Sequence, residues 1–155
     1  MTIRELRRED IEEVIKLLKQ MIIINGYREE YPSHQPDDLT LKVNLMYSLK
    51  SNDFDVFIAE DKEKIIGIAG ITYYSSFWDS KDLFANTIFW DSNPECPKIE
   101  QMKAMIKLQE TMEERVREKG GTVFTIYSDI NYVAPEKYLK KIGYILRNLP
   151  YCKEI

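Results

Sequence analysis

The spacing of the apolar residues changes near residue 54, and this change limits the folds that the chain can adopt. Apolar residues recur at helical spacing over about residues 11–24 and 37–50, and then alternate over residues 54–60 and 65–74. The first two segments are therefore predicted helices. The next two are predicted strands, which form a hairpin around a tight turn at residues 61–64.

The second half of the chain alternates strands with helices. It predicts a strand over 83–90, a long helix over 98–119, a strand over 122–127, a short helix over 134–142 and a closing strand over 144–151. With an opening strand at residues 2–7, the order is β-α-α-β-β-β-α-β-α-β. We expect an α/β (α+β) domain with a mixed, mostly antiparallel sheet flanked by about four helices.

Several helix ends carry capping signals. Asp10 is the expected N-cap of the first helix, and Glu13 three positions later completes a capping box. Pro135 lies in the first turn of the last helix, and Gly143 follows its end.

Length and composition indicate one globular domain over residues 1–155, with 44% hydrophobic and 31% charged residues. No apolar run approaches the roughly 20 residues that cross a bilayer, and no secretory signal is present, so we expect a cytoplasmic protein without a membrane partner. A net charge of −4 argues against a nucleic-acid partner. Cys96 and Cys152 lack the spacing of metal ligands, so no metal is predicted.

Several segments resemble the GNAT superfamily of acetyl-CoA-dependent N-acetyltransferases, including its short phage and bacterial members. The resemblance covers nearly the whole chain and rests on the order of its pieces. These pieces are residues 56–61 with 65–67, Phe89-Trp90-Asp91 with Pro94-Glu95, residues 117–121, residues 138–144 and residues 151–155.

The resemblance implies where the cofactor binds. In the family, the fourth and fifth strands splay apart, and the pantetheine arm of acetyl-CoA pairs with the exposed strand backbone. Phe89, Trp90 and Asp91 would line that wall. The pyrophosphate would lie at the start of the long helix. The candidate residues there are Lys98, Gln101, Met102 and Lys103.

The expected pyrophosphate loop departs from the family pattern Q/R-x-x-G-x-G/A. No glycine occurs between Gly70 and Gly120, so no alignment restores the motif, and Glu100 would repel a phosphate. Lys98 and Lys103 could still bind phosphate as point charges.

The expected general acid is a tyrosine of the last helix. Asn131, Ala134 and Tyr138 fit the family spacing N-x-x-A-x-x-x-Y, whereas counting back from Gly143 places Leu139 at the tyrosine position. One residue on a helix is a rotation of about 100°. We favour Tyr138 as the acid, with Asn131 beside it. The general base stays open among residues at strand ends and in loops: Glu60, Asp91, Tyr127, Ser128 and Asp129.

The resemblance thus implies an N-acetyltransferase that transfers acetyl from acetyl-CoA to a small-molecule or protein amine by direct attack. The alternative is a catalytically inert GNAT-like domain that serves as a binding or structural protein, for example of a phage. Phe77 and Trp78 are then candidate contact residues. The absent glycines favour the alternative, and the spacing up to Tyr138 favours the enzyme. Neither the acceptor nor the oligomeric state follows from the sequence.

Overall fold

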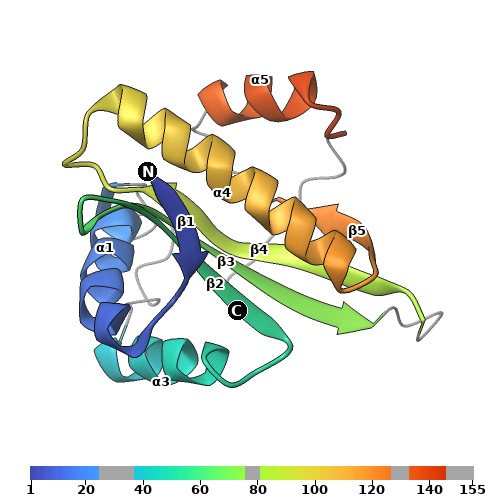
Figure 1. The fold of residues 1–155 in the computed structure, drawn as a ribbon, viewed down its shortest axis with the longest axis horizontal. Helices are drawn as coiled ribbons and strands as arrows, with labels where there is room; N and C mark the ends of the chain where they lie inside the picture. Colours follow the sequence, from blue (N-terminus) through green and yellow to red (C-terminus); the bar gives the residue numbers. More distant parts are fainter. Residues whose placement is uncertain (25–36, 76–80, 127–132, 146–155) are drawn as a thin grey trace, which may run out of the picture.

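The computed structural model describes residues 1–24, 37–75, 81–126 and 133–145, with the side chains of 22–24 and 133–136 left aside. Its elements follow the predicted order (Figure 1). They are β1 (Thr2–Glu5), the 3-10 turn η1 (Arg8–Asp10), α1 (Ile11–Ile24), α3 (Asp38–Ser48), β2 (Phe54–Asp61), β3 (Lys64–Ser75), β4 (Leu83–Ser92), α4 (Lys98–Glu118), β5 (Gly121–Thr125) and α5 (Val133–Lys141). Most of the predicted closing strand lies outside the described residues.

The strands form one sheet in the order β1-β2-β3-β4-β5. Neighbours are antiparallel up to β4, and β4 pairs with β5 in parallel through the crossover helix α4. Helices α4 and α5 lie on one face of the sheet, and α1 and α3 cover the other (Figure 1). The predicted mixed, mostly antiparallel sheet flanked by helices is confirmed.

Each face of the sheet has its own apolar core, because successive side chains of a strand point to opposite faces. Val56 and Ile58 of β2 belong to the core that includes α1, and Phe57 and Ala59 belong to the core that includes α4. Burial on both faces explains why the alternation predicted for this strand is broken by four successive apolar residues, 56–59.

Helix α4 approaches the sheet closely at Gly67 of β3. A β-carbon added there would lie 3.1 Å from Leu108 Cδ1, 3.3 Å from Ala104 Cβ and 3.1 Å from the carbonyl oxygen of Asp91. The small residues at 67 and 104 therefore bring the first half of α4 down onto the sheet, beside the end of β4.

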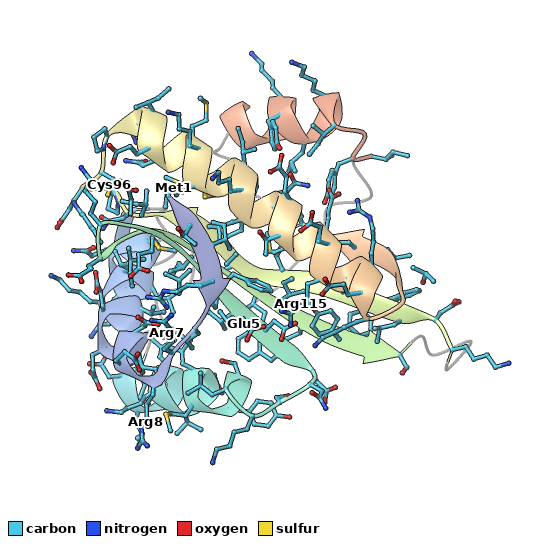
Figure 2. All side chains as sticks on the ribbon, viewed as in Figure 1. Met1, Glu5, Arg7, Arg8, Cys96 and Arg115 are labelled. Carbon is cyan, nitrogen blue, oxygen red and sulfur yellow. The ribbon has the colours of Figure 1, made fainter. Side chains whose placement is uncertain are left out.

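The other end of α4 is held by charge. Arg115 forms an ion pair with Glu5 of β1, toward which it extends in Figure 2, and another with Asp55 at 3.6 Å. Just after the helix, Lys119 pairs with the same Asp55 at 3.1 Å, and Tyr73 donates a hydrogen bond to it at 2.8 Å. These contacts fix the C-terminal end of α4 against β1 and β2.

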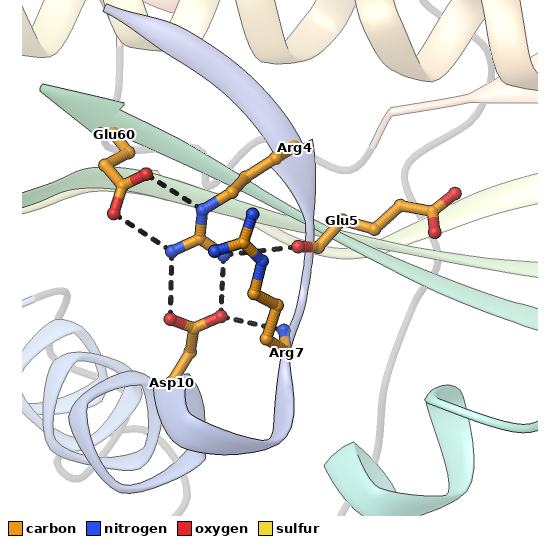
Figure 3. Close-up of polar contacts among 5 residues, drawn as sticks. All are labelled: Arg4, Glu5, Arg7, Asp10 and Glu60. Carbon is orange, nitrogen blue, oxygen red and sulfur yellow. Dashed lines mark hydrogen bonds and ion pairs between the residues drawn. The ribbon is translucent and has the colours of Figure 1, made fainter. Parts of the chain in front are cut away.

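A second charged cluster joins β1 to the start of α1 and to β2 (Figure 3). Arg4 donates to Asp10 at 2.7 and 2.9 Å, to Glu60 at 2.9 and 3.0 Å, and to the carbonyl of Glu5 at 3.3 Å. All five N–H donors of its guanidinium are thus used.

The N-cap expected at Asp10 is wrong. Asp10 ends the turn η1, and its carboxylate accepts from Arg4 and from the Arg7 N–H at 2.7 Å, both of which precede α1. Asp10 is a hydrogen-bond acceptor beside the start of α1, as expected, but its partners are Arg4 of β1 and the N–H of Arg7 and not the N–H groups of the helix.

Asp10→Asn is expected to destabilise the fold in a pH-dependent way. Burial opposes ionisation of Asp10, but the hydrogen bonds from Arg4 and the Arg7 N–H outweigh it and hold the pKa of Asp10 below its usual value. Such a carboxylate stabilises the fold above its unfolded pKa of about 3.9, and this contribution is lost as the pH falls through the folded pKa. We expect a loss of about 1–3 kcal/mol at pH 7.

Urea unfolding at pH 7 and at acid pH measures this loss, and the gap between variant and wild type should shrink below about pH 4. Glu9→Gln is the control, because Glu9 is an exposed neighbouring carboxylate. An equal gap at both pH values would contradict the ionic role of Asp10.

Gly67→Val is expected to lower the free energy of unfolding by about 1–3 kcal/mol, because the added methyl groups overpack the contact with α4. Lys64→Val, at the exposed start of the same strand, controls for valine in a strand. Denaturant unfolding compares the two, and equal stability of both variants would show that α4 shifts without cost.

Candidate functional site

Strand β4 extends beyond the end of its parallel partner, β5. Its pairing with β5 runs from Leu83↔Gly121 to Asn86↔Thr125, where β5 ends, and β4 continues along β3 to Ser92↔Gly67. Within the described residues, β5 therefore covers only the first part of β4. This agrees with the expected divergence of the fourth and fifth strands.

A β-bulge lies where the pairing with β5 stops. On β3, Gly70 pairs with Phe89 and Ile71 pairs with Thr87, so Ile88 is an extra residue in β4. The ring of Phe89 covers Gly70, where a β-carbon would come within 2.6 Å of it. Bulges bend a strand and re-aim its backbone, and they are common beside active sites. The bulge thus turns the second part of β4 at the point where β5 leaves it.

The side chains of the predicted cofactor wall are used by the protein itself. Phe89 packs against the core under α1, and Trp90 packs against the core under α4. The Trp90 indole donates to the Met105 carbonyl at 3.0 Å. Asp91 is half-buried, and its Oδ1 accepts from the Ser92 N–H at 2.7 Å. The wall that β4 can offer to a ligand is therefore its backbone.

Asn93, which is not among the residues predicted from the sequence, closes the turn between β4 and α4. Asn93 is buried, and its backbone N–H donates to Ile66 O at 2.8 Å while Nδ2 donates to Ile65 O at 3.0 Å. Its Oδ1 accepts from the Glu95 N–H at 3.0 Å. An Asn before a Pro at a strand end is a turn signal that could have identified it.

Gln101 ties the same turn to the helix. Its Nε2 donates to Cys96 O at 2.6 Å, and its Oε1 accepts from Ser92 Oγ at 3.1 Å and from Lys98 Nζ at 3.3 Å. The side chain is buried and faces the turn. Gln101 therefore acts on the expected phosphate site by holding its backbone in place.

The first turn of α4 leaves backbone donors for an anion. The carbonyl of Pro97 accepts from Glu100 and Gln101, so the N–H groups of Lys98 and Ile99 have no acceptor within the helix. Both predicted lysines, Lys98 and Lys103, are exposed, and so is Met102. The helix dipole and the lysines favour an anion here, and Glu100 opposes it.

Helix α5 and the residues just after it contact α4 through tyrosine hydroxyls. Tyr138 donates to Gln109 Oε1 at 2.9 Å, and Tyr144 donates to Glu113 Oε1 at 2.8 Å. Gln109 lies one turn beyond Met105, which receives the Trp90 indole. Tyr138 therefore contacts α4 about one turn from the contact made by the second part of β4.

The two residues considered for the acid position differ in burial. Leu139 is buried at 7% exposure, whereas Tyr138 is half-buried with its hydroxyl on α4. Burial, followed by the charges of Glu110 and Glu113, raises the pKa of Tyr138, so its hydroxyl stays protonated at neutral pH.

The remaining candidates fall elsewhere. Asn131, Tyr127, Ser128, Asp129, Phe77 and Trp78 lie outside the described residues. The carboxylate of Glu60 binds Arg4 on the opposite edge of the sheet from β5 (Figure 3). Over the described ranges, no cluster of three or more His, Cys, Asp or Glu side chains could hold a metal ion, and no helix is long and apolar enough to span a membrane.

No protein-family model and no curated protein matches the chain. Solved structures do match it over nearly its whole length. A transcriptional regulator from Bacillus halodurans superposes with a TM-score of 0.80 at 14% identity, covering 99% of each chain. A predicted acetyltransferase with acetyl-CoA from Clostridium acetobutylicum gives 0.72 at 15% identity, covering 99% of this chain and 94% of the other.

A GNAT family acetyltransferase from Staphylococcus aureus gives a TM-score of 0.69 at 16% identity, covering 99% of this chain and 98% of the other. An aminoglycoside 6'-N-acetyltransferase from Acinetobacter haemolyticus gives 0.71 at 9% identity, covering 100% and 99%. At these identities the matches show the fold, and they support the resemblance read from the sequence: the chain has the fold of the GNAT acetyltransferases.

Proposed function

We propose that the protein is an N-acetyltransferase that uses acetyl-CoA as the acetyl donor and a small-molecule amine as the acceptor. The observation that carries this proposal is that, over the described residues, β4 extends beyond β5, next to the start of α4. A strand edge of this kind can bind the amides of a pantetheine arm as an added strand would. The structural neighbours include acetyltransferases, among them one with acetyl-CoA and one that acts on aminoglycosides.

The residues at the start of α4 fit a pyrophosphate in part. The N–H groups of Lys98 and Ile99, together with the charges of Lys98 and Lys103, supply donors and positive charge. Asn93 and Gln101 close the turn that glycines form in the family, and no described residue of this turn has a positive φ. The turn itself therefore does not need the missing glycines.

Transfer would then proceed by direct attack. The lone pair of the amine attacks the acetyl carbonyl, a C–N bond forms and the C–S bond breaks. The leaving sulfur takes the proton of the Tyr138 hydroxyl, the amine loses a proton to water, and Tyr138 is reprotonated from solvent. Tyr138 is suited to this role because its hydroxyl is protonated at neutral pH and docks one helical turn from the contact of Trp90.

A specific observation favours the second candidate, a GNAT-like domain that binds a partner without catalysis. Trp90 spans from β4 to the backbone of α4, and Glu100 lies in the first turn of the helix. The indole of Trp90 reduces the space for a cofactor between β4 and α4, and the carboxylate of Glu100 repels its phosphates. One matched structure of this fold is a transcriptional regulator rather than a named acetyltransferase.

Calorimetric titration with acetyl-CoA and with CoA separates the two functions. We expect saturable binding of both at micromolar concentration. Lys98→Gln combined with Lys103→Gln should weaken binding by about 10-fold or more, since each phosphate contact contributes electrostatically. Lys64→Gln, an exposed lysine of β3, is the control. Absence of binding at millimolar CoA would exclude the acetyltransferase and favour the binding domain.

Tyr138→Phe tests the acid in a panel of amines, with release of free CoA as the readout. Loss of a positioned general acid should lower kcat by about 10²–10⁴-fold and leave the Kd for acetyl-CoA nearly unchanged. Tyr47→Phe is the matched control, because Tyr47 is exposed on α3. A kcat equal to that of the wild type would remove Tyr138 from the mechanism.

A further inference from the structure

The face of α4 beneath α5 receives a row of aromatic donors. Met105, Gln109 and Glu113 are spaced by four residues and therefore lie on one face of the helix. Trp90 donates to the carbonyl of the first, Tyr138 to the side chain of the second, and Tyr144 to the side chain of the third. Gln109 is 2% exposed, so its amide must find partners inside the protein.

The donors and acceptors of this row are fixed by Glu113. Glu113 Oε1 accepts from Tyr144 and from Gln109 Nε2, and Glu113 Oε2 accepts from Arg117 at 2.5 Å. A carboxylate only accepts hydrogen bonds, so the amide nitrogen of Gln109 must face Glu113. The amide oxygen then faces Tyr138, whose hydroxyl donates to it. A flip of the amide would lose the bond to Glu113 and place the amide oxygen against a carboxylate.

We propose that Gln109 and Glu113 of α4 are positioning residues that set the location of the Tyr138 hydroxyl for acetyl transfer. The catalytic role of these two residues rests on the proposed function, whereas their hydrogen bonds are independent of it. Tyr138 lies on α5, and α4 is packed on the sheet through Ala104, Leu108 and Met112. The contact with Gln109 therefore ties the hydroxyl to the same rigid helix that Trp90 of β4 contacts.

In this arrangement the Tyr138 hydroxyl donates its hydrogen bond to Gln109 before the reaction. When the thiolate leaves, the O–H turns about the C–O bond from Gln109 toward sulfur, while the ring keeps its place. The hydrogen bond given up is worth about 1 kcal/mol, and a displacement of about 1 Å would cost roughly 100-fold in rate. Positioning thus outweighs the bond that is lost.

Gln109→Met keeps the size of the side chain and removes both hydrogen bonds. We expect kcat to fall by about 10-fold or more while KM for acetyl-CoA stays within about twofold, because only the placement of the acid changes. In the Tyr138→Phe background the same substitution should have almost no further effect on kcat. An equal loss in both backgrounds would overturn the proposal, since Gln109 would then act on the fold and not through Tyr138.

The exchange Gln109→Glu with Glu113→Gln provides a rescue. The new carboxylate at 109 can accept from Tyr138, the new amide at 113 can donate to it, and the total charge is unchanged. We expect Gln109→Glu alone to be impaired, because two carboxylates then meet, and the exchanged pair to recover most of kcat. A pair no better than the single variant would contradict the positioning role.

Glu110→Gln is the matched control for Glu113→Gln. Glu110 is exposed on the same helix and, like Glu113, acts on the charge environment of Tyr138. If charge alone mattered, the two variants would lower kcat alike. If the bonds matter, only Glu113→Gln should lower it, by several-fold.

NMR of protein labelled with ¹³Cζ-tyrosine gives a readout without activity. The resonance of Tyr138, assigned with Tyr138→Phe, should move most in Gln109→Met and Glu113→Gln and much less in Glu110→Gln, which changes only a nearby charge. A Tyr138 resonance indifferent to Gln109→Met overturns the geometry even if the enzyme is active. If the resonance shifts but the protein does not bind acetyl-CoA, the contact between Gln109 and Tyr138 is supported and the catalytic function is excluded. Failure of the positioning contact and failure of the proposed function therefore give different results.

Discussion

The close contact between α4 and β3 at Gly67 is the constraint on which the candidate site depends. Leu108 and Ala104 approach the backbone of β3 so closely that the position of α4 along the sheet is set there. Packed interiors do not deform continuously, so this one contact fixes the neighbouring distances as well. Gln101 can reach the turn after β4, Trp90 can reach the carbonyl of Met105, and Gln109 faces α5 because α4 lies in this place.

Helix α4 also separates the two ends of the proposed chemistry. Its free N–H groups are at Lys98 and Ile99, and the proposed acid docks at Gln109, which at 1.5 Å per residue lies about 16 Å along the axis. A small acyl phosphate cannot touch both ends. A thioester at the end of a long pantetheine arm can bridge them, with the backbone of β4 alongside. The spacing therefore supports acyl-CoA as the donor class.

The sequence predicted the fold well because its signals are local. The change of apolar period near residue 54 and the glycine that follows the last helix, Gly143, depend on neighbours in the chain. The N-cap at Asp10 was misread because its decisive partner, Arg4, also binds Glu60, a residue far away in the sequence. Asn93 was missed for a similar reason, because its partners are carbonyls of β3. Gln101 was expected at the phosphate site, and its contact with the Cys96 carbonyl could not be read from the sequence. The contact of the Tyr138 hydroxyl with Gln109 depends on the packing of α5 on α4, which no periodicity gives.

In a phosphate-binding loop, glycine normally serves two purposes at once, and this chain shows which of them is needed. Glycine permits a positive φ, and it lets a phosphate come close to the backbone. The first requirement does not arise here, since among the described residues a positive φ occurs only at Lys62, Glu63, Gly120 and Gly143. The second does arise, because Ile99 and Met102 are exposed near the helix start, at 55% and 54%. In the proposed function a phosphate would have to approach from the side of Pro97, where two N–H groups remain and lysine charge would supply part of what a glycine loop gives. Without the motif, the proposed site would depend more on side-chain charge and on the strand edge of β4.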